Sequence, residues 1–167
     1  AYLARTPSSA SNRKTWTWSG WVKRSNLGTA NVYQRLFEAH VNNSNLTTIT
    51  FTDADQLEIM SRTSGTNRIH VRADAKLRDP SAWYHFIVAV DTTATANTDK
   101  CKLYVNGVLQ DATYYSTTPD NHETHINSAI AHHIGSKDGS SVFFDGYIAD
   151  CFLIDGSQLS PTSFGAF

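Results

Sequence analysis

Residues 144–155 read FDGYIADCFLID, and this stretch decides the fold class of the chain. It has the form of an apolar strand that closes a β-sheet. Its value comes from its position, because it follows two other strand signatures in a fixed order: WYHF at residues 83–86 and KLYVNG at residues 102–107. Three such signatures in one chain indicate a β-sheet protein far more strongly than any one of them alone.

The dipeptide Asn106-Gly107 is the strongest short hairpin signal in the chain. Both central residues of a type I′ turn need positive φ, which Asn and Gly adopt readily. We therefore predict a hairpin in which residues 101–105 pair with residues 108–114. Residues 83–91 are the most hydrophobic run, and they predict a central strand that is covered on one or both faces.

The N-terminal half shows the alternation of apolar and polar residues that is typical of strands. It predicts strands at residues 15–23, 33–41, 46–52, 57–62 and 68–77. In the last of these, the apolar face comprises Ile69, Val71, Ala73, Ala75 and Leu77, and the polar face His70, Arg72, Asp74 and Lys76. The alternation also predicts that the four tryptophans are core residues: Trp16, Trp18, Trp21 and Trp83.

Little of the chain has a helical pattern. Residues 92–100 form a polar connection without periodicity, and residues 116–130 are irregular, with Pro119 excluding a central strand. Only residues 160–164 suit a helical turn, with Ser160 as N-cap and Pro161 at the first helical position. The predicted architecture is therefore an all-β sandwich or barrel.

Length and charge narrow the class of protein further. A chain of 167 residues is the size of one domain, so we treat residues 1–167 as a single unit. The net charge of -1 gives no clustered positive charge for binding nucleic acid. No apolar run reaches the ~18 residues that a membrane-spanning helix needs, so we expect no membrane insertion.

Two cysteines, Cys101 and Cys151, each lie within an apolar strand pattern. They are either two buried thiols or one disulfide, and the scarcity of cysteine favours thiols, because secreted disulfide scaffolds usually carry more. The chain begins with Ala1 close to a strand-like segment. This start suggests a processed product or a fragment of a longer protein.

The ordered signatures described above resemble the laminin-G-like, concanavalin A-like jelly roll, and the resemblance covers nearly the whole chain. It implies a sandwich of two antiparallel sheets that binds a ligand or displays a surface, rather than one that catalyses a reaction. Within this group, the opening stretch (residues 2–24) and the ending stretch (residues 145–165) look like modules of structural and fibre proteins of tailed phages, especially marine ones. This likeness implies a role in a virion, as a tail fibre, appendage or capsid-decorating protein.

Concanavalin A-like folds also include glucanases, whose active strand carries paired acidic residues. This chain has three glutamates, and none has a second Glu two to five residues away: Glu38, Glu58 and Glu123. The carboxylate pair of a glucanase is therefore absent from the sequence. We expect a protein that is not an enzyme.

Sugar binding in such sandwiches uses aromatic side chains beside polar groups. The best candidate strip is the polar face of residues 68–77, with residues of the next strand beside it: His70, Arg72, Asp74, Tyr84 and His85. The alternative is that this face is simply the solvated side of a sheet.

The resemblance also allows a bound Ca²⁺, because many related domains hold calcium through loop oxygens. The candidate ligands are Asp91, Asn97 and Asp99, with Asp53 and Asp55 in a second loop; turn formation is the alternative role for these residues. Four histidines cluster late in the chain, and we interpret them as solvated loop residues: His122, His125, His132 and His133.

Two hypotheses for function follow. The first is a non-enzymatic structural or adhesive module of a phage virion, which contacts other virion subunits or itself and binds surface glycans. The second is a secreted or cell-surface carbohydrate-binding lectin domain of a cellular organism. A degenerate glycosidase is a third class, and it lacks the carboxylate pair that it needs.

Overall fold

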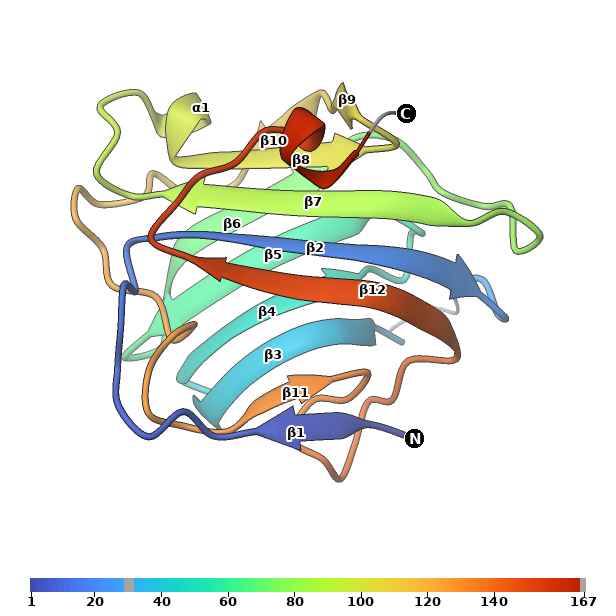
Figure 1. The fold of residues 1–167 in the computed structure, drawn as a ribbon, viewed down its shortest axis with the longest axis horizontal. Helices are drawn as coiled ribbons and strands as arrows, with labels where there is room; N and C mark the ends of the chain where they lie inside the picture. Colours follow the sequence, from blue (N-terminus) through green and yellow to red (C-terminus); the bar gives the residue numbers. More distant parts are fainter. Residues whose placement is uncertain (29–31, 166–167) are drawn as a thin grey trace.

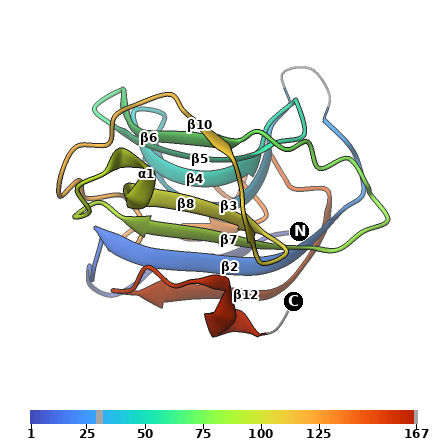
Figure 2. The ribbon, with the colours of Figure 1, turned by 90° about the horizontal axis from the view of Figure 1, so that it is seen from above.

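The computed structural model describes residues 1–28 and 32–165, and within these residues the chain forms two packed antiparallel sheets (Figure 1). The seven-stranded sheet has the order β1 (Leu3–Arg5), β11 (His132–Ile134), β3 (Gln34–Asn42), β4 (Asn45–Phe51), β5 (Leu57–Thr63), β6 (Thr66–Ala73) and β10 (Ala112–Tyr114). The five-stranded sheet has the order β12 (Gly146–Asp155), β2 (Thr15–Arg24), β7 (Tyr84–Asp91), β8 (Cys101–Val105) and β9 (Val108–Leu109). Figure 2 shows the two layers from above. The predicted sandwich is confirmed.

The core lies between the two sheets and follows the predicted alternation. Trp16 and Trp18 are fully buried in it, together with Ile69, Val71 and Ala73 of β6. The prediction for the tryptophans is wrong at Trp21, which is only partly buried and lies beside His85 outside the core, and at Trp83, which is 42% exposed just before β7. That side chain lies beside Tyr147 of β12, with ring centroids 6.4 Å apart.

The hairpin at Asn106-Gly107 is confirmed, with φ of 49° and 80° at its two central residues. Its second arm differs from the prediction. Only β9 (Val108–Leu109) pairs with β8, and the chain then crosses to the other sheet, where β10 pairs with β6. This crossing places Tyr115, the residue after β10, beside the polar face of β6.

The outer face of the five-stranded sheet is covered by the segment that follows β12. Thr17 Oγ1 donates to Ser157 O at 2.7 Å and accepts from Leu159 N at 2.8 Å. The segment ends in a 3-10 helix, Pro161–Phe164, whose Phe164 ring lies 6.1 Å from that of His85. The predicted turn is confirmed, although Ser160 forms no side-chain cap hydrogen bond. The outer face of the seven-stranded sheet, in contrast, carries a hollow that is open to solvent.

Residues 92–100, predicted as an irregular connection, contain one short helix, α1 (Asn97–Lys100). In the described residues, no helix is long and apolar enough to cross a membrane.

Cys101 and Cys151 are free thiols, as favoured from their scarcity. They lie on β8 and β12, and β2 and β7 separate these strands. At ~4.8 Å per strand, the two backbones are roughly 14 Å apart, about twice the separation that a disulfide tolerates. Burial raises the pKa of Cys101 to about 12 and that of Cys151 to about 11.

Candidate functional site

The outer face of the seven-stranded sheet carries a hollow of about 340 Å³. Its lining side chains come from β5, β6 and the start of β3: Tyr33, Arg35, Glu58, Met60, Arg62, Asn67, His70 and Arg72. They share this face because residues two apart on a strand point the same way. Thr48 and Thr50, which point outward from β4 between them, are fully buried, so the longer side chains enclose the floor.

Strand register sets the order of charges across this face. One row runs Arg35, Thr50, Glu58, Arg72 from β3 to β6, and the next row runs Glu38, Thr48, Met60, His70. A carboxylate in each row therefore has a cation within reach on the same face. The sequence alone gives the parity of each strand, and the register is what brings these residues together.

Glu58 is the centre of this arrangement. Its Oε2 accepts hydrogen bonds from Arg72 Nε at 2.8 Å and His70 Nε2 at 3.1 Å, and Arg72 Nη2 lies at 2.7 Å. Burial alone would raise the pKa of Glu58, but the hydrogen bonds from His70 and Arg72 outweigh it and lower the pKa. The carboxylate thus stays ionised and holds the side chains of both Arg72 and His70 in place.

Tyr115 provides an aromatic surface beside these polar groups. Its ring lies 4.7 Å from the His70 ring, and the Arg72 guanidinium lies 5.0 Å from its centroid. A backbone hydrogen bond from Tyr115 N to His70 O, at 2.8 Å, holds it next to β6. The side chain is nevertheless 53% exposed. An exposed ring held from behind offers a flat face to a ligand.

Arg62 and Asn67 form the other end of the hollow. Arg62 Nε donates to Asn67 Oδ1 at 2.8 Å, and Arg62 Nη1 donates to Asn43 O at 3.1 Å. Arg35, at the β3 side, lies 2.8 Å from Glu38 and above the ring of Tyr33. Three guanidinium groups therefore surround the hollow.

Only part of the predicted sugar strip is brought together. His70 and Arg72 lie side by side in the hollow, whereas Asp74 lies just beyond β6, where its Oδ1 accepts from Thr113 Oγ1 at 2.8 Å. Tyr84 and His85 are not beside them, because β7 belongs to the other sheet. His85 is 3% exposed and forms a 2.8 Å hydrogen bond with Ser19 under Phe164.

The predicted sugar strip did not include seven residues of this region: Tyr33, Arg35, Glu58, Met60, Arg62, Asn67 and Tyr115. The sequence could have indicated Tyr115, because successive side chains on a strand point to opposite faces and one ring of the pair Tyr114-Tyr115 must therefore point outward. Tyr114 packs against the core and Tyr115 is exposed, as this alternation demands. The pairing of β10 with β6, which decides where the outward ring lies, has no signal in the sequence.

The structure does not group the candidate calcium ligands. Asp91 Oδ1 accepts from Thr93 and Thr15, Asn97 Oδ1 accepts from Thr118 N, and Asp99 pairs with Lys102 at 3.1 Å. In the second loop, Asp55 pairs with Arg24 and Arg78, each at 2.9 Å. Within residues 1–28 and 32–165, no group of three or more His, Cys, Asp or Glu side chains is placed to hold a metal ion. Calcium binding by Asp91, Asn97 and Asp99 stays a prediction.

The clustered histidines are not solvated loop residues, so that interpretation is wrong. His132 and His133 lie on β11 and are 6% and 8% exposed, and they point to opposite faces, toward Phe37 and Tyr2. Burial lowers the pKa of His122 to about 4 and also lowers that of His125. Neutral imidazoles fill polar positions between the long loop and the sheet, where His122 Nε2 lies 3.3 Å from Ser61 Oγ.

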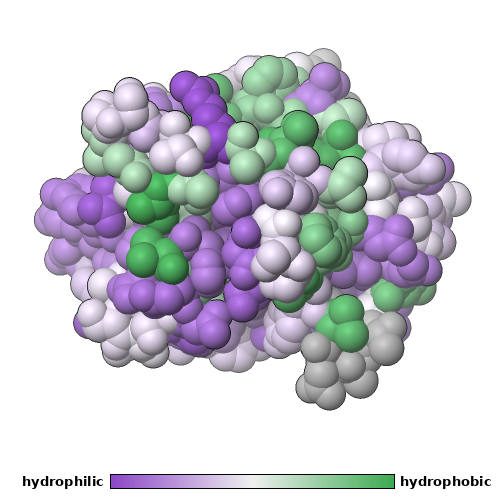
Figure 3. Space-filling model, turned by 90° about the horizontal axis from the view of Figure 1, so that it is seen from below, coloured by the Kyte–Doolittle hydropathy of each residue, from purple (hydrophilic) through white to green (hydrophobic). Residues whose placement is uncertain are grey.

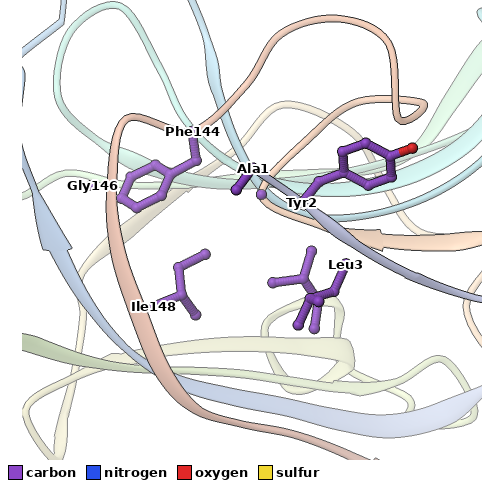
Figure 4. Close-up of a pocket in the computed structure, with 8 residues that line it drawn as sticks. Ala1, Tyr2, Leu3, Phe144, Gly146 and Ile148 are labelled. Atoms are coloured by element: carbon purple, nitrogen blue, oxygen red, sulfur yellow. The ribbon is translucent and has the colours of Figure 1, made fainter.

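A second opening lies between the edge strands β1 and β12. It contains two hollows, of about 630 and 230 Å³, that share Leu3 and Ile134. Figure 4 shows the smaller one, with Phe144 and Ile148 on one side of it and Tyr2 and Leu3 on the other. On this side of the molecule, hydrophobic patches alternate with hydrophilic surface (Figure 3). Asn127, which lines the larger hollow, donates from Nδ2 to Asp155 Oδ1 at 2.9 Å and to Asn12 O at 2.8 Å.

A sandwich of two antiparallel sheets is the fold of the concanavalin A-like class of proteins, which includes lectins and glucanases. Residues 2–162 match a laminin G family model described as the concanavalin A-like lectin/glucanases superfamily. The chain belongs to this family. No curated protein sequence matches the chain significantly.

Solved structures with the same fold include several that were determined with sugars. Domain 4 of an extracellular arabinanase from Geobacillus stearothermophilus, in complex with arabinotriose, is similar with a TM-score of 0.64 and 18% identity, over 89% of this chain and 64% of that chain. The CBM40 of a Ruminococcus gnavus sialidase, bound to α2,3-sialyllactose, gives 0.62 and 13%, over 98% and 95%. Domains LG4-5 of the mouse laminin α1 chain give 0.65 and 14%, over 96% and 40%. Identities this low show the fold alone.

Proposed function

We propose that the protein is a non-catalytic carbohydrate-binding module that holds a glycan in the hollow of the seven-stranded sheet. The observation that carries the proposal is the Tyr115 ring, exposed at its front and held from behind by His70 and Arg72. A sugar ring has one apolar face and several hydroxyl groups. The apolar face stacks on an aromatic ring, and the hydroxyls take hydrogen bonds from nearby polar groups.

The chemistry of the hollow supports binding over hydrolysis. Glu38 and Glu58 are on the same face, but β4 lies between their strands, so their backbones are about 10 Å apart or more. Each carboxylate is also engaged by arginine, Glu38 by Arg35 and Glu58 by Arg72. The arabinanase domain and the sialidase CBM40 share the fold and were solved with bound oligosaccharides, which gives the proposal further support.

A glycan array with the wild type and a Tyr115→Ala variant tests this function. Tyr115 contributes little to the core, so the variant should fold normally and lose at least about tenfold in affinity for any bound glycan, given that such a ring contributes ~1–3 kcal/mol to a stacked contact. Tyr147→Ala is the matched control, because Tyr147 is 63% exposed on the other sheet. Equal binding by Tyr115→Ala and the control would remove the hollow from the proposal, and no binding by the wild type would remove carbohydrate recognition.

Arg72 is a less suitable first substitution, although it lies in the same place. Its removal leaves Glu58, whose side chain is 5% exposed, with the hydrogen bond from His70 at 3.1 Å. Breaking a buried ion pair in this way is destabilising. Loss of binding in Arg72→Ala should therefore be interpreted only beside its unfolding curve.

We further propose that the module serves in a phage virion, where it docks on other virion subunits or on copies of itself and presents its glycan site outward. The likeness of residues 2–24 and 145–165 to modules of phage fibre proteins supports this role. The alternative is a secreted or cell-surface lectin domain. Mass spectrometry of purified particles separates the two, since a virion component is present at a copy number that matches the particle symmetry, and a secreted lectin is absent from particles.

A further inference from the structure

Nitrogen groups of arginine and histidine reach the surface of the hollow, while Glu58 in the hollow and Glu38 beside it are covered. The side chains of Arg72, His70 and Arg35 are 23%, 20% and 13% exposed. Those of Glu58 and Glu38 are 5% and 0% exposed. A ligand that enters the hollow therefore meets guanidinium and imidazole N–H groups before it meets a carboxylate.

Of the three arginines around the hollow, Arg62 is the one that no carboxylate of the described residues neutralises, since Arg35 lies against Glu38 and Arg72 against Glu58. Its nitrogen atoms contact the Asn67 amide oxygen, the Asn43 carbonyl and, through Nη2 at 3.7 Å, the sulfur of Met60. All three partners are neutral, and in the described part of the chain no carboxylate forms an ion pair with Arg62. The contact to sulfur is weak, so Nη2 can exchange it for a stronger acceptor at little cost.

The negative groups nearby do not reverse this balance. Glu58 neutralises Arg72, and Glu38 stands against Arg35. Asp53 acts electrostatically on Tyr33, at the side of the hollow away from Arg62. The end of the hollow formed by Arg62, Asn67 and His70 thus presents donors and a positive charge.

We infer that the glycan bound in the hollow is anionic, carrying a carboxylate or a sulfate on a sugar that stacks against Tyr115. This inference rests on the proposed carbohydrate-binding function and specifies the ligand of that same site. Arg62 binds the anionic group, because a guanidinium donates two parallel hydrogen bonds to a carboxylate or sulfate. His70 and Arg72, fixed by Glu58, donate to the sugar hydroxyls.

The test is an array of matched glycan triplets, in which one sugar backbone is printed in neutral, carboxylated and sulfated forms. The expected result is binding of the charged members at least about tenfold tighter than the neutral member, as one charge-assisted contact supplies. The ranking of carboxylated against sulfated forms identifies which anion the site prefers. Raising the salt concentration should weaken binding of the charged members selectively.

Arg62→Gln assigns the preference to this residue. It should reduce binding of the charged members about tenfold and leave the neutral member unchanged, whereas Arg62→Lys should retain part of the preference. Arg68→Gln is the charge-matched control, because Arg68 acts on His122 and does not line the hollow. Unfolding curves of the variants show whether each is folded.

The outcomes separate the two proposals. Neutral glycans bound as tightly as charged ones, with binding lost in Tyr115→Ala, would overturn the anionic ligand and leave carbohydrate binding in place. An anionic preference that survives Arg62→Gln but falls in Arg68→Gln would overturn the assignment to the hollow. Absence of any glycan binding would overturn both proposals.

Discussion

Glu38 is the carboxylate whose environment departs furthest from water. Its side chain is 0% exposed on the outer face of β3, next to Arg35. Burial raises its pKa to about 7, against the opposing influence of Arg35, and Lys137 and Asp138 of the loop after β11 add smaller effects of opposite sign. The group is therefore close to half protonated at neutral pH.

This shift has a consequence for stability. The folded pKa of about 7 lies above the ordinary value of 4.5, so the native state holds the proton between these values and the unfolded state does not. The free energy of unfolding should therefore fall as pH rises from about 4.5 to 7, by at most roughly 3 kcal/mol from this group. Glu38→Gln should flatten this slope and be more stable than the wild type above pH 7.

Urea unfolding of both proteins at pH 4.5, 6 and 8 measures the effect as a difference, which cancels the buried histidines. Glu123→Gln is the control, because its carboxylate is 55% exposed and pairs with Arg13 at the surface. An unchanged difference between Glu38→Gln and wild type across this range would contradict the raised pKa.

At the residue scale, alternation predicts which side of a strand a side chain faces, and it is right for His70 and Arg72 against Ile69 and Val71. Alternation does not predict how much of an outward-facing polar side chain is exposed to solvent. Glu58 faces outward as the strand pattern requires, and is still 4% exposed, because side chains from neighbouring strands cover it. Such burial depends on which side chains the register places beside Glu58, here His70 and Arg72 of β6, and the strand pattern does not give the register.

The hairpin between β8 and β9 is the element most completely determined by local sequence. Gly107 has φ of 80°. The Asn106 side chain is held by the neighbouring strand β7, because its Oδ1 accepts a hydrogen bond from His85 N at 2.8 Å. Gly107→Val should destabilise the protein by about 1–3 kcal/mol, because a β-branched residue is strained at positive φ.

Thermal and urea unfolding measure this cost. Val108→Thr is the control, since Val108 is 63% exposed and keeps an ordinary strand conformation. Equal stability of Gly107→Val and the control would show that the turn adopts another conformation.

The second arm of the same hairpin shows where element prediction stops. Residues 108–114 have the pattern of one continuous strand. In the structure they form two strands, of which β9 stays on the five-stranded sheet and β10 joins the seven-stranded sheet. The change of sheet occurs at Gln110 and Asp111, whose backbone groups bond Leu103 and Asp74 respectively. These partners lie on different sheets, so the crossing depends on tertiary packing that a local pattern does not contain.

On the scale of the whole molecule, the segment after β12 adds a partial third layer over the five-stranded sheet. Thr17 anchors it with two hydrogen bonds through one hydroxyl. Thr17→Val keeps the shape of the side chain and leaves the Ser157 carbonyl and the Leu159 N–H without this partner. The expected loss is about 1–3 kcal/mol, with unchanged far-UV circular dichroism.

Thr17→Ser retains the hydroxyl and should recover most of this loss, which separates the hydrogen bonds from packing. A Thr17→Val protein as stable as the wild type would show that the layer is held by its other contacts, such as the hydrogen bond from Gln158 Nε2 to Asp99 O at 2.7 Å and the packing of Phe164 on His85. A loss of β-sheet signal would show that the segment is needed to form the sheet itself.

The order of the three strand signatures was sufficient to predict the sandwich, because each is a local pattern and the family arranges them in one way. The site was predicted only where it follows a single strand, at His70 and Arg72. Except for Asn67 of β6, its other members come from β5, from the start of β3 and from the end of β10, and only the register of four pairings places them together. Tyr84 and His85 were misplaced for the same reason, since adjacency in sequence does not say which sheet a strand joins.

Because the tryptophans are confined to one side of the molecule, intrinsic tryptophan fluorescence reports on one sheet and not on the other. Trp16, Trp18 and Trp21 are on β2 and Trp83 precedes β7, so all four indoles belong to the five-stranded sheet. The hollow on the opposite sheet contains tyrosine and no tryptophan among its lining residues. Intrinsic tryptophan fluorescence should therefore report unfolding, through Trp16 and Trp18 leaving the core, while staying silent when a ligand occupies the hollow. Tyrosine absorbance is the intrinsic probe suited to that face.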